Sequence, residues 1–147
     1  MNAISARYTF IQQVVIEAGK LAVSYYHDRN QLNIEKKKED GQDLVTIADK
    51  NTEQFIREKI HQQYPLDALF GEEGGYTQGA SQYTWVVDPI DGTSAFIFGL
   101  PSWCISIAHL GWTTKYTNCG CVWSRTGGVV SCNGGSWRLF KPITYPS

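Results

Sequence analysis

Tyr83-Thr84-Trp85-Val86-Val87 is an apolar run, and Asp88-Pro89-Ile90-Asp91-Gly92-Thr93 follows it directly, in the middle of a chain of 147 residues. A short apolar run of this kind is typical of a buried β-strand. Pro89 fixes its own φ and lacks a backbone donor, and Gly92 permits backbone angles that are closed to other residues. The strand is therefore expected to end in a turn that carries two carboxylates three residues apart.

This turn collects oxygen atoms. It can present the Asp88 and Asp91 carboxylates, the Ile90 carbonyl and the Thr93 hydroxyl in one direction. Hard oxygen donors suit Mg²⁺, Mn²⁺ or Ca²⁺. A turn with two solvated aspartates is the alternative, but the six-residue string directly after an apolar strand favours a metal-binding turn.

A second acidic element lies upstream, in Leu69-Phe70-Gly71-Glu72-Glu73-Gly74-Gly75. Its two adjacent glutamates follow a short apolar run and stand between glycines. Neighbouring carboxylates repel each other, and a divalent cation shared with Asp88 would relieve that repulsion. An exposed polar loop is the alternative interpretation of this element taken alone.

A third element is Asp43-Leu44-Val45-Thr46-Ile47-Ala48-Asp49. Thr46 followed by Asp49 resembles a capping box, so we expect a helix to begin here and to continue through Ile60 with one apolar face. Capping alone would explain Asp49. At a helix start Asp49 could also accept a hydrogen bond from Thr93 or from a water bound to the metal.

These three elements, in this order and spacing, resemble the inositol monophosphatase family of metal-dependent, lithium-sensitive phosphatases. The resemblance extends to about Leu110. The residues that carry it are Asp43-Leu44-Val45-Thr46-x-Ala48-Asp49, Gly71-Glu72-Glu73, Trp85 to Thr93 with Phe96, and Gly99-Leu100-Pro101-x-Trp103-x-Ile105-Ser106-Ile107-Ala108.

The resemblance implies a set of site residues. Glu72, Asp88 and the Ile90 carbonyl would hold one Mg²⁺, and Asp88 with Asp91 would reach a second. Two or three ions are typical of the intact family, and Li⁺ inhibits it. Asp49 with Thr93 would position and deprotonate the attacking water. Three further assignments follow from the resemblance: catalysis for Glu73, phosphate binding for Gly92 and Thr93, and a basic residue near the site for Lys38.

Lys38 has an alternative interpretation, because it also ends the run Lys36-Lys37-Lys38, which could be a solvated stretch of positive charge. The chemistry that the family implies is metal-assisted hydrolysis. Cations on the phosphate oxygens remove the repulsion between a phosphate dianion and the attacking water and stabilise both the attacking and the leaving oxygen.

The implied fold is α+β, the N-terminal portion of a layered αβαβα sugar-phosphatase sandwich, with two helices and then a mainly antiparallel sheet. An apolar stripe at helical spacing predicts the first helix over about 4–26, and the capping box opens the second. Charged coil is expected from His27 to Asp40. Strands are expected around 68–70, at 83–87 and at 104–110.

Composition narrows the partners. With 14 acidic and 13 basic residues the net charge is near zero, which gives no argument for a nucleic acid or an anionic membrane. The start of the chain has no signal-peptide pattern, and no apolar stretch is long enough to span a bilayer. We expect a cytoplasmic protein whose partner is a small phosphorylated substrate, with Cys104 as a buried core thiol. A homodimer is typical of the family, but is doubtful for this chain.

The sequence changes character at Gly111. No acidic residue follows it, while three of the four cysteines and three of the five tryptophans do. We therefore predict that residues 1–110 form the N-terminal metal-binding part of the domain and that 111–147 are a tail outside the family pattern. The cysteine spacing, Cys119-x-Cys121, does not fit a zinc knuckle.

A shift of one nucleotide would explain this change. Synonymous codons permit Arg125 to Pro146 to be read in the next frame as a glycine-rich string that ends Leu-Asn-Arg-Ser-Pro-Ile-Arg, as is typical of the family. A genuinely divergent tail is the alternative. Sequencing the gene across the codons for His109 to Trp112 would distinguish the two.

The resemblance also implies a second half, which brings a further aspartate for the second ion and most of the residues that select the substrate. We therefore expect Mg²⁺-dependent hydrolysis of a small phosphate monoester, such as an inositol phosphate, impaired by truncation. The alternatives are an inactive metal-binding remnant or pseudogene product, a member of the histidinol-phosphate phosphatase branch, and an intact interaction module with a Trp- and Cys-rich tail.

Overall fold

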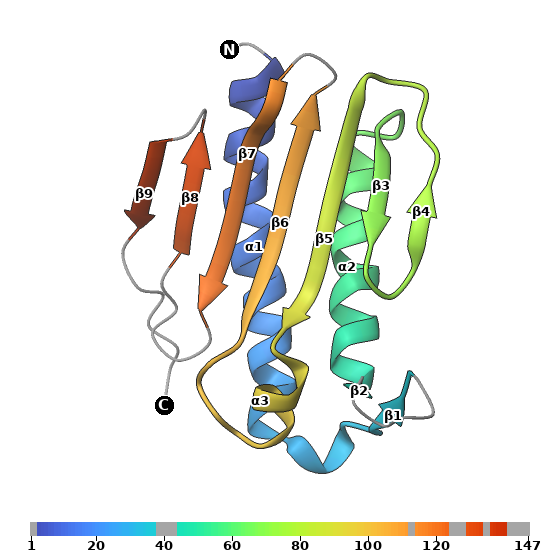
Figure 1. Ribbon diagram of the computed structural model, residues 1–147, viewed down its shortest axis with the longest axis vertical. Coiled ribbons are helices and arrows are strands. Elements are labelled where there is room, and N and C mark those ends of the chain that lie inside the picture. The colour runs from blue at the N-terminus through green and yellow to red at the C-terminus, as the bar shows by residue number, and fades with distance from the viewer. Residues whose placement is uncertain (1–2, 38–43, 112–113, 124–128, 134–135, 141–147) are drawn as a thin grey trace.

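A computed structural model of the chain describes residues 3–37, 44–111, 114–123, 129–133 and 136–140. Two long helices, α1 (Ala3–His27) and α2 (Ile47–Gln63), lie on one face of a seven-stranded sheet (Figure 1). The sheet strands are β3 (Ala68–Gly71), β4 (Gly75–Thr77), β5 (Tyr83–Asp91), β6 (Cys104–Gly111), β7 (Thr114–Trp123), β8 (Val129–Asn133) and β9 (Ser136–Phe140). The smaller elements are η1 (Arg29–Gln31), β1 (Glu35–Lys36), β2 (Leu44–Val45) and α3 (Thr93–Ile97).

The strand order in the sheet is β4-β3-β5-β6-β7-β8-β9. Strands β3 and β5 pair in parallel, and the other neighbours pair antiparallel. Parallel strands have their carboxyl ends at the same edge of a sheet. Gly71, the last residue of β3, pairs with Val87, so Glu72 lies beside Asp88 of β5. Strand β5 continues to Asp91, so the predicted turn begins later than expected.

The core lies between the helices and the sheet. Ile11, Val15, Ala18 and Ala22 are fully buried, as expected for one face of α1 at helical spacing. They pack in one cluster with residues of α2, β5 and β6, including the fully buried Trp85. The α+β class, the two helices, the mainly antiparallel sheet and the three predicted strands are confirmed.

A buried ion pair ties the start of α1 to the sheet. Arg7 donates through Nε to Asp67 Oδ2 at 3.0 Å and through a terminal nitrogen to Asp67 Oδ1 at 3.1 Å. The Trp85 indole and the Ser81 hydroxyl also donate to this carboxylate, at 3.0 and 2.6 Å. The Arg7 guanidinium lies over the ring of Tyr64 at 4.2 Å from its centre, and over a second tyrosine ring. We call this group the Arg7–Asp67 cluster.

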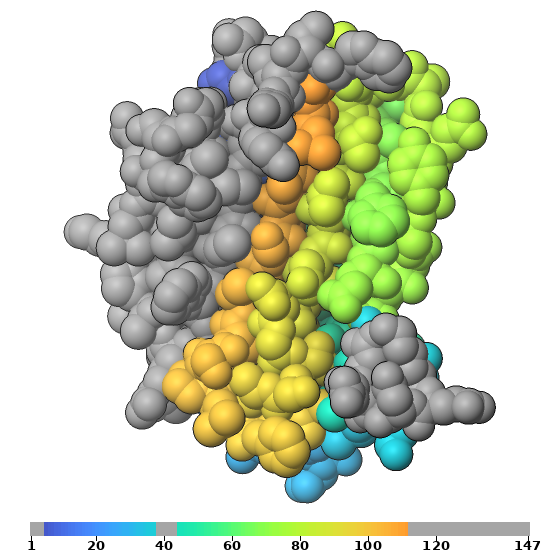
Figure 2. Space-filling view, in the orientation of Figure 1, coloured from blue at the N-terminus to red at the C-terminus, as the bar shows by residue number. Residues whose placement is uncertain are grey.

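The sheet face away from the helices shows side chains of β4, β3, β5 and β6 side by side at the surface (Figure 2). Phe70 and Tyr76 are cross-strand partners and are 50% and 62% exposed. These two side chains form a small exposed apolar pair on this face of the sheet.

The sequence analysis missed several elements. Strands β7 to β9 lie in the region where no secondary structure was expected, and η1 and β1 interrupt the predicted coil. Strand β7 contains Gly120, which breaks a strand pattern but pairs with Ile107 of β6. Backbone pairing with a long neighbour outweighs local preference here. The out-of-frame interpretation concerns the gene and stays a prediction.

No helix in the described part of the chain combines the length and the hydropathy needed to cross a membrane.

Candidate active site

The first turn of α2 places Asp49. Thr46 caps the helix: its hydroxyl accepts from the backbone N–H groups of Ala48 and Asp49 at 3.1 and 3.4 Å. In return, the Thr46 backbone N–H donates to Asp49 Oδ2 at 2.8 Å. The predicted capping box is therefore confirmed, with Asp49 in the position usually held by a glutamate or glutamine.

Asp49 also reaches the turn after β5. The Thr93 hydroxyl lies 2.9 Å from Asp49 Oδ1 and 3.1 Å from the Ile90 carbonyl oxygen. Asp49 is 1% exposed, and this burial raises the pKa of its carboxyl group, while the hydrogen bonds from Thr46 and Thr93 oppose the rise. The structure thus brings together two residues, Asp49 and Thr93, that are 44 positions apart.

A bulge in β5 aligns its two aspartates. Residues three apart in a regular strand point to opposite faces. Asp88 pairs with Ser106 and Asp91 pairs with Cys104, so three steps along β5 match two along β6. The extra residue reverses the alternation, as β-bulges do, and both carboxylates reach one cavity.

This acidic cavity has a volume of about 220 Å³. Its lining includes the predicted metal-binding residues, and the described residues around it are Leu44, Glu72, Asp88, Ile90, Asp91, Gly92, Thr93 and Ser94. Within the described residues, the buried Oδ1 atom of Asp88 has no hydrogen-bond partner. Burial, followed by the nearby Glu72 and Asp91 carboxylates, raises the pKa of Asp88 to about 7.

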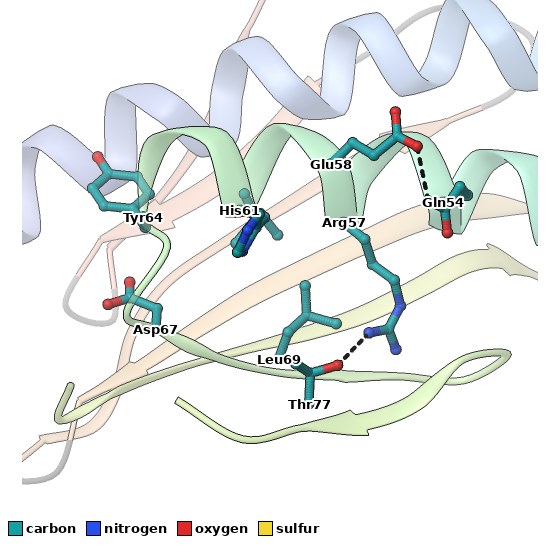
Figure 3. Close-up of a pocket in the computed structure, with 9 residues that line it drawn as sticks. Gln54, Arg57, Glu58, His61, Tyr64, Asp67, Leu69 and Thr77 are labelled. Atoms are coloured by element: carbon teal, nitrogen blue, oxygen red, sulfur yellow. Dashed lines mark hydrogen bonds between the residues drawn. The ribbon is translucent and has the colours of Figure 1, made fainter. Parts of the chain in front are cut away.

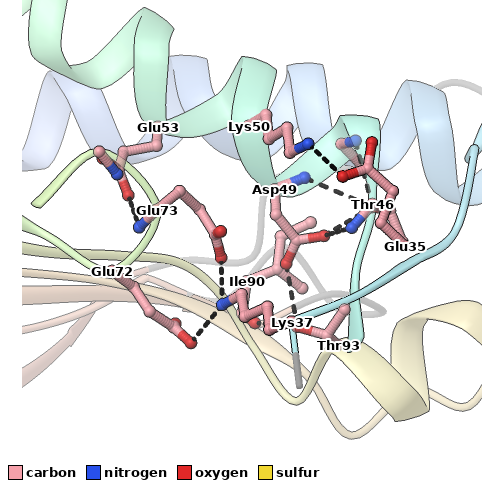
Figure 4. A network of polar contacts seen from close by, with 12 residues as sticks. Glu35, Lys37, Thr46, Asp49, Lys50, Glu53, Glu72, Glu73, Ile90 and Thr93 are labelled. Atoms are coloured by element: carbon pink, nitrogen blue, oxygen red, sulfur yellow. Dashed lines mark hydrogen bonds and ion pairs between the residues drawn. The ribbon is translucent and has the colours of Figure 1, made fainter. Parts of the chain in front are cut away.

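A lysine ammonium group bridges the two glutamates of the acidic loop. Lys37 Nζ lies 3.0 Å from Glu72 Oε1 and 2.7 Å from Glu73 Oε1 (Figure 4). Burial alone would lower the pKa of Lys37, but its hydrogen bonds and charge interactions with Glu73 and Glu72 outweigh burial and raise it. Burial raises the pKa of Glu73, and Lys37 opposes that rise.

Lys37 was missed by the sequence analysis, which chose Lys38. Lys38 lies outside the described residues, as does Asp43 of the third motif. The signal that could have found Lys37 was the run Lys36-Lys37-Lys38 itself, which offers three lysines at one place without selecting among them.

The cavity fits a hard divalent cation. Its donors are carboxylate oxygens and the Ile90 carbonyl, the Asp88 oxygen has no partner, and the Lys37 ammonium already supplies a positive charge beside Glu72. In the described part of the chain, no three His, Cys, Asp or Glu side chains already form a metal-binding group. The salt bridge to Lys37 explains part of this, because Glu72 points to Lys37.

Three other predicted residues have distinct environments. Glu73 lines a different cavity of about 410 Å³, together with Lys50, Glu53 and Arg57. Gly92 has a φ of 93°, and a Cβ there would lie 2.8 Å from the Ser102 carbonyl oxygen, so only glycine fits easily. The prediction of Cys104 as a core thiol is wrong. Its side chain is half-buried and lies 4.0 Å from Asp91 Oδ2, because it sits at the end of β6 beside the bulge.

Known proteins share this sequence and fold. The model of the inositol monophosphatase family matches residues 4–126, which extends past Leu110. The protein qutG of Emericella nidulans is 36% identical over 110 residues, covering 70% of this chain and 33% of that protein. A histidinol-phosphatase of Chlorobaculum parvum is 41% identical over 92 residues, covering 63% and 34%. The chain spans about a third of the length of these curated relatives.

Solved structures agree with the fold. The extragenic suppressor protein suhB from Bartonella henselae superposes with a TM-score of 0.86 at 24% identity, over 93% of this chain and 53% of that one. The Thermotoga maritima IMPase gives a TM-score of 0.79 at 24% identity, over 91% and 51%. The family match covers most of this chain and the arrangement of its strands and helices is the same, so the protein belongs to the inositol monophosphatase family.

Proposed function

We propose that this chain carries the acidic half of a site for the Mg²⁺-dependent hydrolysis of a small phosphate monoester. The observation that carries the proposal is the acidic cavity after β5, where the buried Asp88 Oδ1 has no hydrogen-bond partner among the described residues. A buried carboxylate oxygen without a partner is costly unless a cation neutralises it.

Glu72, Asp88, Asp91 and the Ile90 carbonyl would hold the metal. When bound, Mg²⁺ supplies positive charge for the phosphate oxygens and acidifies a water molecule. The Oδ1 atom of Asp88 is buried and has no hydrogen-bond partner among the described residues, whereas Asp91 is exposed. This difference supports a role for Asp88 as the shared ligand and for Asp91 as the ligand of a second, more accessible position.

Asp49 and Thr93 would position the attacking water and accept its proton. Asp49 Oδ2 is occupied by the Thr46 backbone and hydroxyl, at 2.8 and 2.6 Å, so its Oδ1 is the atom that faces Thr93. If Thr93 donates its proton to Asp49 Oδ1, the Thr93 oxygen can accept a hydrogen bond from an attacking water. Burial raises the pKa of Asp49, which makes this carboxylate a stronger base.

The substrate class follows from the names of the relatives, which include an inositol-1-monophosphatase of Mycobacterium bovis, 41% identical over 78 residues, and a histidinol-phosphatase. We propose a small polar alcohol phosphate. The polyol and the histidinol branches both stay open, because the described cavity is lined by groups suited to the metal and the phosphate rather than to the alcohol.

The chain spans about half of the solved structures that it matches. A second candidate is a metal-binding remnant without turnover. The salt bridge between Lys37 and Glu72 favours this candidate, because an ammonium group already pairs with one of the proposed metal ligands.

One titration and one assay separate these possibilities. The purified chain is titrated with Mg²⁺ in a calorimeter, and phosphate release from inositol 1-phosphate and from histidinol phosphate is then measured with and without Mg²⁺. Binding with Mg²⁺-dependent release supports the phosphatase, and Thr93→Val should reduce that release by about 100-fold or more. Binding without release identifies the remnant. No heat of Mg²⁺ binding at millimolar concentrations would rule out both.

A further inference from the structure

Glu53 is a buried carboxylate that neither the motifs nor the proposed chemistry use. It lies in the second turn of α2, four residues after Asp49, and is 2% exposed. A spacing of four residues places both side chains on the same face of the helix. Burying an unpaired carboxylate costs several kcal/mol, so its partners show what it does.

Those partners are the backbone of the acidic loop. Glu53 Oε2 accepts from the Glu73 backbone N–H at 2.6 Å, and Glu53 Oε1 accepts from the Gly74 backbone N–H at 2.7 Å (Figure 4). Arg57, one turn further along α2, donates through Nε to the same Oε1 at 2.7 Å. Hydrogen bonds to an ionised group are about twice as strong as neutral ones.

Arg57 also contacts strand β4. One terminal nitrogen donates to the Gly75 carbonyl oxygen at 2.5 Å, and the other lies 3.1 Å from the Thr77 hydroxyl, across the gap between α2 and β4 (Figure 3). Its positive charge also neutralises Glu53. The loop therefore gains a fixed anchor without a further net negative charge near Glu72 and Glu73.

The glycines of the loop fit this contact. A Cβ atom at Gly71 would overlap the Glu53 carboxylate, and one at Gly74 would lie 2.8 Å from both Glu53 Oε1 and Arg57 Nε. The loop backbone can approach the pair this closely only because these positions have no side chain. In the sequence Gly-Glu-Glu-Gly, the two glycines thus allow the close contact with Glu53 and Arg57, and the two glutamates between them are the acidic pair.

We propose that Glu53, held by Arg57, is the positioning residue of the acidic loop 71–75. It fixes the loop backbone from the α2 side, while the Glu72 backbone N–H donates to the Val87 carbonyl oxygen at 3.1 Å on the β5 side. The helix that carries Asp49 and the strand that leads to Asp88 are thereby set at a fixed separation from Glu72. Glu53 itself is not among the residues that line the acidic cavity.

The part of this inference that concerns Mg²⁺ rests on the proposed function. The test therefore measures the loop anchor and Mg²⁺ binding separately. Glu53→Gln preserves shape but offers one oxygen where the carboxylate offers two, so either the Glu73 or the Gly74 N–H loses its acceptor. Glu58→Gln is the matched control, because Glu58 lies in the same helix, is exposed and accepts a hydrogen bond from the side chain of Gln54.

The first readout is amide hydrogen exchange of Glu73 and Gly74 in the Mg²⁺-free full chain. We expect at least one of the two amides to exchange about tenfold faster in Glu53→Gln, and neither to change in Glu58→Gln. Exchange identical to the wild type would overturn the anchor.

The second readout is the dissociation constant for Mg²⁺, measured by calorimetry without substrate. We expect a 10- to 100-fold weaker constant for Glu53→Gln than for Glu58→Gln, roughly the loss typical when a residue behind a metal ligand is changed, with each variant measured well below its unfolding midpoint. Faster exchange with unchanged Mg²⁺ affinity would overturn the positioning role.

If Glu53→Gln does not fold, Arg57→Lys takes its place, because lysine retains the charge beside Glu53 but cannot contact Gly75 and Thr77 together. The same weakening of Mg²⁺ binding is expected, and unchanged binding would contradict the inference. A wild-type chain that binds no Mg²⁺ would overturn the proposed function, and the exchange data would still decide whether Glu53 holds the loop.

Discussion

The Arg7–Asp67 cluster and the acidic cavity lie near opposite ends of β5, and they treat buried charge in opposite ways. In the Arg7–Asp67 cluster one carboxylate receives four hydrogen bonds, including two from a guanidinium group, and the charges balance. At the acidic cavity, which Glu72, Asp88 and Asp91 line, the Lys37 ammonium group pairs with Glu72, and one Asp88 oxygen has no partner among the described residues.

The difference distinguishes a cluster whose charges balance from one that carries excess negative charge. A balanced ionic cluster contributes to folding only while both partners are present. A cluster with excess negative charge costs stability unless a cation neutralises it. Substitutions in the two clusters should therefore change stability in opposite directions.

The largest effect is expected for Asp67→Asn. It leaves the buried Arg7 guanidinium without its carboxylate and should lower the free energy of unfolding by about 3–5 kcal/mol, measured by urea denaturation. The double variant Arg7→Met, Asp67→Leu removes both charges and should be less destabilised than Asp67→Asn. A double variant that is worse than the single one would contradict the view of the cluster as a matched pair.

The next effect concerns pH. His109 is fully buried between the rings of Tyr83 and Trp85, with ring centres 5.0 and 4.7 Å away. Burial, followed by the charge of Arg7, lowers the pKa of His109 from 6.5 to about 4, and Asp67 opposes that shift. Below pH 6.5 the unfolded chain therefore binds a proton that the folded chain does not.

Stability should consequently fall as the pH decreases from about 6.5 to about 4, by about 3 kcal/mol from this residue. His109→Gln cannot take up the proton, so its unfolding free energy should fall less steeply over the same range. Unfolding curves for both proteins at matched pH values give the difference. Parallel pH dependences would show that His109 is not the group that titrates.

A smaller effect of opposite sign is expected at the acidic cavity. Asp88→Asn removes one of the mutually repelling charges and should raise stability without Mg²⁺ by about 1 kcal/mol. The wild type should gain stability as Mg²⁺ is added, while the variant should not. Thermal unfolding with and without Mg²⁺ measures both. Loss of stability in the variant without Mg²⁺ would make Asp88 a structural residue like Asp67.

The smallest effect is expected for an ion pair outside both clusters. Lys59 and Glu17 join α2 to α1 at 2.7 Å, but their side chains are 38% and 46% exposed. Solvent and salt screen such a pair, so Lys59→Ala should change the unfolding free energy by about 0.5 kcal/mol or less. A larger loss would show that burial is not what distinguishes the Arg7–Asp67 pair.

The local parts of this fold could be read from the sequence. Thr46 and Asp49 predicted the start of α2 because a capping box is a contact between residues three apart. The apolar run before Asp88 predicted β5 for a similar reason. What could be predicted in each case is a pattern within one element.

The rest depends on contacts between elements. Glu53 has the sequence signature of an ordinary polar helix residue, and only the approach of the acidic loop shows that it is buried. The choice of Lys37 within a run of three lysines depends in the same way on where Glu72 and Glu73 lie. The bulge between Asp88 and Asp91 is defined by how β5 pairs with β6. The sequence of β5 alone does not reveal this pairing.

Among the described residues, those that line the acidic cavity all fall between Leu44 and Ser94. These residues are therefore close together in the sequence, and a change of sequence, length or reading frame beyond Gly111 alters none of them. Such a change acts only on what the rest of the chain contributes to the site, such as further metal ligands and contacts to the substrate. A lineage could in this way lose turnover long before it loses the residues by which its ancestry is recognised.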